Sequence, residues 1–136
     1  MTCPHCTKCD LKFFDPMPTG DQGFYEDLQK FDWYYKDDKY EYGYVKNFFQ
    51  NTDNVLEIGC GKGAFSKLIP HKHYVGLEFS EYAKELADAD GIDVRNESIE
   101  HHSKSNFEKY DVVCSFQVVE HVSDPDGFLT SAVDCL

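Results

Sequence analysis

Residues 54–65 read NVLEIGCGKGAF, and this stretch decides the fold. Val55, Leu56 and Ile58 form a short, mostly apolar run, which predicts a strand buried on both faces of a sheet. Three glycines follow within five positions, and glycine accepts positive φ and leaves room for a ligand against the backbone. Apolar side chains then recur at helical spacing over 64–69. The stretch therefore predicts a strand, a glycine-rich turn and a helix.

The glycine turn fits two classes of ligand. Gly59, Gly61 and Ala64 satisfy the permissive dinucleotide fingerprint G-x-G-x-x-G/A. The tighter pattern E-x-G-x-G-x-G runs over 57–63 and resembles the first motif of class I S-adenosylmethionine-dependent methyltransferases. In that family the acidic residue and the glycine backbone hold the methionine part of the cofactor, which implies contacts from Glu57, Gly59, Cys60, Gly61 and Gly63. A tight turn without a ligand is the plainer alternative.

Length and charge limit the classes of function. A chain of 136 residues predicts one domain at most, which is short for a doubly wound enzyme. The formal net charge of −12 argues against nucleic acid or an anionic membrane as the partner. Neither a membrane span nor the apolar core of a signal peptide is evident in the sequence. We expect a cytoplasmic protein with a small-molecule substrate, in which Cys60, Cys114 and Cys135 are reduced thiols.

Three cysteines near the N-terminus suggest a metal. Cys3, Cys6 and Cys9 form a C-x2-C-x2-C pattern with His5 between them. Thiolates at this spacing can bind zinc, but a structural zinc site needs four ligands in a closed tetrahedron. The pair Cys6 and Cys9, with the segment after it, also resembles the second knuckle of a zinc ribbon in some bacterial class I methyltransferases, including sugar C-methyltransferases. Zinc binding and a ribbon remnant with free thiols both stay open.

Residues 24–44 are dense in aromatic side chains, with Lys, Asp and Glu among them. This mixture does not predict a basic surface for nucleic acid. In related methyltransferases the segment before the first strand lies over the cofactor, and Tyr34 and Tyr35 are the candidates for that position. The alternative is a helix that packs aromatic rings on the sheet, through the face Tyr44, Val45, Phe48 and Phe49.

The second apolar run, over 74–77, ends in Glu78 and Phe79. An acidic residue at the carboxyl end of the second strand is placed to accept hydrogen bonds from ribose hydroxyls. S-adenosylmethionine and NAD both carry such hydroxyls, so this position does not separate the two. Ser80 can cap the helix that follows, and Gly91 can end it.

A brief third strand is predicted over 92–94. The residues after it lie where chains of the methyltransferase family pass the adenine ring, which implies contacts from Ser98 and Ile99. The family often has Asp at the hydrogen-bonding position, so Ser98 departs from the common pattern. His101 and His102 are predicted to be surface histidines rather than metal ligands.

Residues 110–129 read YDVVCSFQVVEHVSDPDGFL and supply a second match. The passage resembles the fourth motif of small-molecule methyltransferases, in which a strand end is followed by E-H-V or E-H-L and a helix. The resemblance implies further cofactor contacts from Ser115, Phe116 and Gln117. It also implies His121 as the base for an acceptor proton, with Glu120 orienting it. A local structural role for these two residues is the alternative.

The spacing of Gln117, Glu120 and His121 is i, i+3 and i+4, which would place them on one face of a helical turn. Quinone O-methyltransferases show a similar E-x-x-E-H pattern that is linked to a divalent ion. Gln117 replaces the first acid of that pattern. We therefore expect a substrate-facing role without a tightly held metal.

The expected fold is α/β and Rossmann-like, with a parallel sheet ordered 3-2-1-4 and helices on both faces. The resemblance covers four of the family's seven strands, so strands five to seven are expected to be absent and the chain to be a piece of a larger enzyme. Its expected parts are a partial zinc-ribbon-like segment, 1–23; an aromatic-rich helical lead-in, 24–53; and the N-terminal part of a methyltransferase domain, 54–136. The exposed edge of the fourth strand is expected to support self-association.

These patterns together predict methyl transfer from S-adenosylmethionine to a small-molecule acceptor. A sugar, a quinone-like compound and an envelope precursor are the acceptor classes that the resemblance suggests. Two alternatives stay open: an NAD-binding oxidoreductase fragment, and a fragment that binds the cofactor without turnover.

Overall fold

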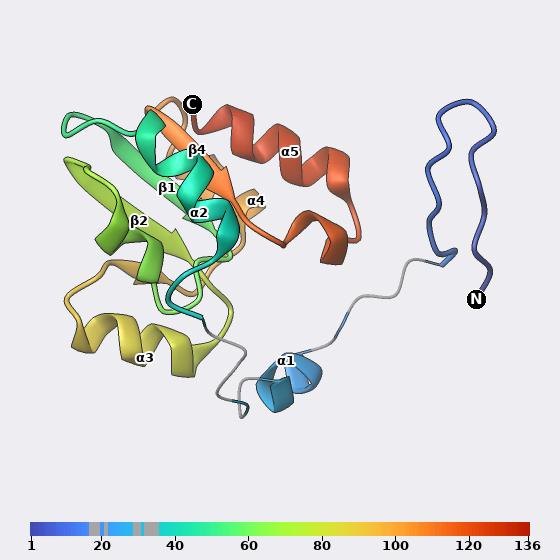
Figure 1. The fold of residues 1–136 in the computed structure, drawn as a ribbon, viewed down its shortest axis with the longest axis horizontal. Coiled ribbons are helices and arrows are strands. Elements are labelled where there is room, and N and C mark those ends of the chain that lie inside the picture. The colour runs from blue at the N-terminus through green and yellow to red at the C-terminus, as the bar shows by residue number, and fades with distance from the viewer. Residues whose placement is uncertain (17–19, 21, 29–30, 32–35) are drawn as a thin grey trace.

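The computed structural model describes residues 1–16, 20, 22–28, 31 and 36–136. Its centre is a parallel sheet of four strands, β1 Asn54–Ile58, β2 His73–Leu77, β3 Val94–Arg95 and β4 Val112–Ser115 (Figure 1). The strand order is β3-β2-β1-β4, which confirms the predicted order. In the central register, Leu56 of β1 is paired with Val75 of β2 and with Val113 of β4. Among the described strands β4 pairs with β1 alone, and its four residues are half-buried.

Helices connect and cover the strands. The described α-helices are α1 Gln22–Leu28, α2 Tyr40–Val45, α3 Glu81–Ala89, α4 Ile99–His102 and α5 Pro125–Asp134. Shorter 3-10 helices are η1 Lys46–Phe48, η2 Ala64–Leu68, η3 Ser103–Ser105 and η4 Val119–His121. No helix in the described part of the chain is both long and apolar enough to cross a membrane.

The helix predicted over 64–69 is present as η2, but it is a 3-10 helix and not an α-helix. Gly63 precedes it in the left-handed conformation, and Ile69 follows it with extended backbone. The Ser66 N–H and hydroxyl both donate to the Gly63 carbonyl oxygen, at 3.1 and 2.7 Å. This i to i−3 pairing is the 3-10 pattern, which suits a helix of only five residues.

The two faces of the sheet carry different clusters of buried side chains. Side chains alternate along a strand, so neighbours in β1 point to opposite faces. One face packs against α4 and α5 through Leu56, Ile58, Val75, Leu77, Ile99, Tyr110, Phe128 and Cys135. The other packs against α2 (Figure 1) and η2 through Tyr42, Phe49, Val55, Phe65, Ile69 and Tyr74. Helices therefore cover both faces, as predicted.

The lead-in segment packs on the sheet through part of the predicted face, because Phe49 is buried and Val45 packs against the same cluster. Tyr44 and Phe48 are 63% and 79% exposed, whereas Tyr42 and Phe49 are buried. The prediction was wrong for Tyr44 and Phe48; α2 ends at Val45 and the chain continues as a 3-10 helix, so one α-helical spacing does not run through all four residues. Tyr34 and Tyr35, the predicted aromatic cover of the cofactor, lie outside the described residues.

The connection between α3 and β3 is partly as predicted. Ser80 caps α3 by accepting a hydrogen bond from the Ala83 N–H at 3.0 Å, and Gly91 takes φ +73° after the helix. The strand predicted over 92–94 instead begins at Val94. The Ile92 N–H donates to the Ala87 carbonyl oxygen at 2.9 Å, so this residue belongs to the turn that ends α3.

His102 is not a surface residue, which corrects the sequence-based prediction. It is 1% exposed, whereas its neighbour His101 is on the surface as predicted. The His102 Nδ1 lies 2.7 Å from Glu97 Oε1, and its Nε2 lies 2.9 Å from the Tyr110 hydroxyl. His101 Nδ1 contacts the other Glu97 oxygen at 2.8 Å. Both histidines therefore share one carboxylate.

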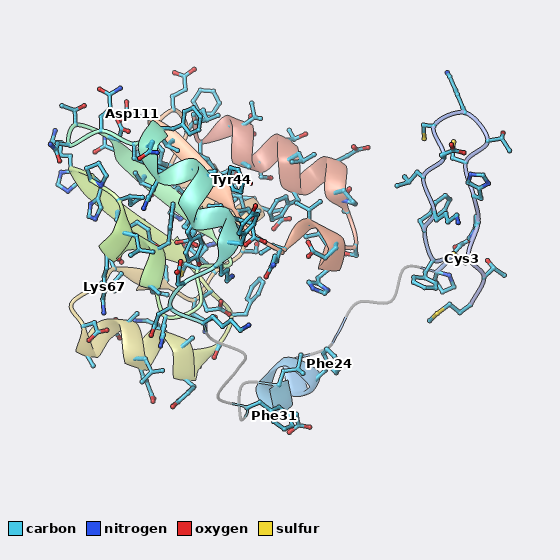
Figure 2. All side chains as sticks on the ribbon, viewed as in Figure 1. Cys3, Phe24, Phe31, Tyr44, Lys67 and Asp111 are labelled. Atoms are coloured by element: carbon cyan, nitrogen blue, oxygen red, sulfur yellow. The ribbon has the colours of Figure 1, made fainter. Side chains whose placement is uncertain are left out.

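Residues 2–15 form a hairpin, with antiparallel bridges between Thr2 and Asp15 and between His5 and Lys12. Figure 2 shows this hairpin, with Cys3 labelled, apart from the sheet. His5 Nε2 contacts Asp10 Oδ1 at 2.8 Å. The described residues contain no group of three or more His, Cys, Asp or Glu side chains arranged to hold a metal ion. The cysteines at positions 3, 6 and 9 thus do not fit the predicted zinc site.

Candidate cofactor-binding site

The glycine turn after β1 has the backbone that its sequence predicts. Gly59, Gly61 and Gly63 have φ values of +74°, +55° and +73°. The Gly59 and Cys60 N–H groups donate to the Leu77 carbonyl oxygen at 2.8 and 3.1 Å, which fixes the turn to the end of β2. A Cβ on Gly59 would also overlap Val118 Cγ2. Both the positive φ and this steric overlap therefore favour glycine at position 59.

A cavity of about 800 Å³ opens at the carboxyl ends of β1, β2 and β4. Its volume lies within the usual range for small-molecule sites. The predicted residues on its wall are Gly59, Cys60, Gly61, Glu78, Phe79, Phe116, Gln117, Glu120 and His121. The fold therefore brings the glycine turn and the fourth motif to one place, although about sixty residues separate them.

Glu78 holds the two sides of this cavity together. One carboxylate oxygen accepts a hydrogen bond from the Gly61 N–H at 2.9 Å, and the other accepts from the Ser80 N–H at 3.0 Å. A carboxylate has about four acceptor positions, so two of them remain for a ligand. Glu78 can therefore fix the turn and accept hydroxyl hydrogens from a ribose at the same time.

A second cavity of about 220 Å³ adjoins the first and shares Gly59 and Glu78 with it. Ser98 and Ile99, the residues predicted to lie beside the adenine ring, line it. Most of its other wall residues are apolar, including Ile58, Leu77, Val118, Val122 and Phe128. Ser98 Oγ accepts from the His101 N–H at 3.2 Å and so caps α4. A flat, mostly apolar ring fits this space.

Three of the predicted cofactor residues do not line either cavity. Ser115 Oγ donates to the Ile58 carbonyl oxygen at 3.1 Å, and Gly63 starts η2, where a Cβ would lie 2.8 Å from Ile92 Cγ2. Glu57 is 1% exposed and accepts a hydrogen bond from the Tyr74 hydroxyl. These three residues have structural contacts around the turn and do not face either cavity.

Burial controls the chemistry of Glu57. It raises the pKa of the carboxyl to about 7, although the Tyr74 hydrogen bond and the charge of Lys39 act in the opposite direction. Burial and the Glu57 charge likewise raise the pKa of the Tyr74 phenol. The partner across the sheet from Glu57 is Gly76, which has no side chain, so the Tyr74 ring from two residues earlier can reach the carboxylate. The Cys60 thiol fills the space where a Cβ on Gly76 would lie.

Gln117, Glu120 and His121 reach the cavity without sharing a helical face. Gln117 has φ +58° and lies before η4, which begins at Val119, so the predicted i, i+3, i+4 arrangement is wrong. The Gln117 amide Nε2 donates to Glu41 Oε1 of α2 at 2.8 Å. This bond ties the loop after β4 to the segment before β1.

Several cavity residues escaped the sequence-based prediction. Lys36, Lys39, Tyr42 and Asn96 lie outside the two motifs, and Lys62 is a variable position within the glycine motif. The Asn96 Nδ2 donates to the Phe79 carbonyl oxygen and to Glu81 Oε1, both at 2.9 Å, so it links the ends of β2 and β3. The lysines among the aromatic residues before β1 were visible in the sequence, but nothing there placed them against the turn.

Comparison with known proteins then decides the family. The profile of a family described as a methyltransferase domain matches residues 43–136. The chain belongs to this methyltransferase-domain family. The matched residues contain the turn, Glu78, the loop after β3 and the fourth motif, so the family region includes the whole wall of the smaller cavity and most of the wall of the larger one.

Relatives of this methyltransferase-domain chain include two named ubiquinone biosynthesis O-methyltransferase. The protein from Hahella chejuensis is 33% identical over 85 residues, which are 57% of this chain and 36% of the relative. The protein from Hydrogenovibrio crunogenus is 28% identical over 94 residues, which are 62% of this chain and 39% of the relative. The chain thus spans little more than a third of the length of these curated relatives.

A solved structure supports the same family at the level of the fold. It is a SAM-dependent methyltransferase from Thermotoga maritima, named as a possible histamine N-methyltransferase. It superimposes with a TM-score of 0.60 at 29% identity, over 71% of this chain and 44% of that protein.

Proposed function

We propose that this chain binds S-adenosylmethionine and forms the donor side of an enzyme that methylates an oxygen of a small molecule. The observation that carries the proposal is the shared cavity, in which the glycine turn, Glu78 and the His121 loop face one space. The relatives named ubiquinone biosynthesis O-methyltransferase favour oxygen as the accepting atom.

The residues present fit this cofactor. The backbone of Gly59 and Gly61 leaves room for the methionine part, and Glu78 offers acceptor positions to the ribose hydroxyls. The smaller cavity beside Ser98 and Ile99 has the size and apolar lining for a flat base. S-adenosylmethionine would supply an activated methyl group on a sulfonium whose thioether is a good leaving group.

His121 is the residue that we assign to proton removal from the acceptor hydroxyl. It lies in η4 on the cavity wall beside Glu120. An imidazole can accept a proton near neutral pH, and orientation of the two reactants supplies much of the remaining rate. Glu120 is assigned to orient the imidazole.

Calorimetric titration with S-adenosylhomocysteine and, separately, with NAD tests the cofactor. We expect binding of the first ligand and its loss in Gly61→Val, because a branched side chain at φ +55° would strain the turn and occupy the ligand's path. Gly43→Val is the matched control, since a side chain there would meet nothing within 4 Å. Binding of NAD alone would refute the methyltransferase proposal.

The role of His121 needs a separate readout. His121→Gln should leave the dissociation constant of S-adenosylhomocysteine unchanged within about twofold, because this residue is assigned to the acceptor side. With a catechol as the acceptor probe, methyl transfer by the protein that carries this chain should fall by about 100-fold or more. Equal loss of cofactor affinity and turnover would instead mean that His121 shapes the cavity.

A further inference from the structure

Part of the wall of the smaller cavity is a loop. Residues 96–98 join β3 to α4 without helical or strand structure, and Glu97 and Ser98 lie on the cavity wall. The shape of this part of the wall therefore depends on side-chain hydrogen bonds. Asn96 bonds to the Phe79 carbonyl oxygen after β2, and Ser98 bonds within α4. Glu97 is the residue of the loop whose side chain contacts a fully buried residue, His102.

A chain of three polar side chains runs from this loop into the core. Glu97 Oε1 lies 2.7 Å from His102 Nδ1, and His102 Nε2 lies 2.9 Å from the Tyr110 hydroxyl. The Glu97 side chain is 23% exposed, whereas Tyr110 belongs to the buried cluster that packs the sheet against α4 and α5. The Tyr110 N–H donates to the Cys135 carbonyl oxygen after α5 at 2.9 Å. These contacts connect the cavity wall to α5 through the interior of the fold.

The direction of the hydrogen bonds follows from the charge of Glu97. Burial acts to raise the pKa of this carboxyl, but hydrogen bonds from His102 and His101 lower it below its ordinary value. An ionised carboxylate can only accept, so His102 Nδ1 carries a hydrogen and donates it. In the neutral ring Nε2 then accepts from the Tyr110 hydroxyl. The two nitrogens of His102 therefore serve different partners, the cavity wall at Nδ1 and the core at Nε2.

The second histidine beside Glu97 is placed differently. His101 Nδ1 lies 2.8 Å from Glu97 Oε2, but the His101 side chain is 73% exposed. Water competes with an exposed partner of this kind, and its side chain is free to change rotamer. The His102 ring is fixed by the residues packed around it, so its contact can determine where the carboxylate lies.

We propose that His102 is a positioning residue for the smaller cavity. It holds Glu97, and through Glu97 the loop 96–98, where the wall receives the flat base of a bound nucleoside. The inference rests on the proposed function, because it takes this cavity as the site of the cofactor's base. His102 lines neither cavity, so it acts on the ligand only through the residue that it holds.

Two substitutions separate the roles of the two ring nitrogens. The side-chain nitrogen of Asn is bonded to Cγ, as Nδ1 is in histidine, so His102→Asn keeps a donor for Glu97. The side-chain nitrogen of Gln is one bond farther out, as Nε2 is, so His102→Gln keeps a polar partner for Tyr110 and loses the donor to Glu97. Each variant deletes part of a buried ring and one of its two hydrogen bonds, so chemical denaturation should show similar losses of stability.

Calorimetric titration with S-adenosylhomocysteine measures the effect on the cavity. We expect the dissociation constant to rise about tenfold in His102→Gln and to stay within about twofold of the wild type in His102→Asn. Tyr110→Phe should also stay within about twofold, although it loses stability, because His102 can still donate to Glu97. His101→Ala is the control for an exposed donor to the same carboxylate and should stay within about twofold.

A double-mutant cycle tests whether His102 acts through Glu97. Glu97→Ala should weaken S-adenosylhomocysteine about as much as His102→Gln, and the double variant should bind no more weakly than either single one. Glu97→Ala keeps the buried ring, so this variant tests the proposal even where a substitution of His102 prevents folding.

The proposal is overturned if His102→Asn and His102→Gln lose equal affinity, because affinity would then follow stability alone. It is also overturned if Glu97→Ala binds like the wild type, or if the losses in the double variant multiply. If the wild type binds no S-adenosylhomocysteine, the proposed function fails. Amide hydrogen exchange at His101, whose N–H donates to the Ser98 carbonyl oxygen at 3.2 Å, then decides whether His102 holds this wall. It should be faster in His102→Gln than in His102→Asn, and equal rates would overturn the proposal.

Discussion

Two glutamates on opposite faces of the sheet have pKa values shifted in opposite directions. Glu57 faces α2 and has one hydroxyl partner, Tyr74, and burial raises its pKa to about 7. Glu97 lies on the α4 side; burial acts to raise its pKa, but hydrogen bonds from His102 and His101 outweigh burial and lower it. Glu57 is 1% exposed and has one hydroxyl donor, whereas the Glu97 side chain is 23% exposed and has two histidine partners, so depth and hydrogen bonding together set the charge of each.

The largest effect should come from removing the donor on the α4 side. His102→Ala deletes a fully buried ring, removes the partner of one Glu97 oxygen and removes the partner of the Tyr110 hydroxyl. We expect the free energy of unfolding to fall by about 3–4 kcal/mol at pH 7, measured by chemical denaturation. The control His101→Ala removes an exposed donor to the same carboxylate and should cost less than about 0.5 kcal/mol. Equal losses in the two variants would mean that the buried and the exposed histidine contribute equally to stability.

Glu57 should make stability fall as pH rises. Its pKa is about 7 in the folded chain against 4.5 ordinarily, so the folded state keeps a proton that the unfolded state releases between these values. The free energy of unfolding should therefore decrease by about 3 kcal/mol between pH 4.5 and pH 8 from this group. Glu57→Gln should remove that decrease and be more stable than the wild type at pH 8. Glu85→Gln, on the exposed face of α3, should leave the pH profile unchanged.

A smaller effect is expected from the single donor to Glu57. Tyr74→Phe removes the hydroxyl and should raise the pKa of Glu57 further. We expect a loss of about 1–2 kcal/mol at pH 8, where the carboxylate is charged, and a smaller loss at pH 5. Thermal melts at both pH values measure the difference. Tyr40→Phe, which removes an exposed hydroxyl that contacts Tyr44, should change neither melt by more than a degree or two.

The smallest effect concerns Glu97 in acid. Its lowered pKa contributes stability above the ordinary glutamate value, and this stability should be lost as pH falls through the folded pKa. Carboxyl carbon NMR should therefore give two titrations on opposite sides of the ordinary value, Glu97 below it and Glu57 above it. In His101→Ala the Glu97 titration should move upward. No movement would mean that His102 alone holds the charge.

The sequence predicted the parts of the fold that follow from local patterns. Apolar runs and glycine spacing located most of the strands and the turn, and the resemblance to the methyltransferase family supplied the strand order that the structure confirms. His102 was misplaced because α4 has only four residues, which is too few for a helical pattern. Gly61 and Glu78, which the glycine motif and the acidic end of the second strand singled out separately, lie in contact on the cavity wall.

Contacts that depend on register or on distant segments could not be read from the sequence. The Tyr74 partner of Glu57 requires knowing that Gly76 lies opposite the carboxylate. Lys39 and Lys62 share a cavity only because the segment before α2 returns to the turn after β1. The prediction that Gln117 shares a helical face with Glu120 and His121 was wrong because Gln117 has a positive φ, which is uncommon for a residue other than glycine.

The thiol that fills the space beside Gly76 makes two positions depend on each other during evolution. A methyl group at position 76 would overlap the Cys60 side chain, and it would lie 3.2 Å from Val94 Cγ2. Gly76→Ala as a first step should therefore disrupt the turn. After Cys60→Gly the same substitution should be accommodated, so the order of the two changes decides whether a lineage keeps a folded cofactor site.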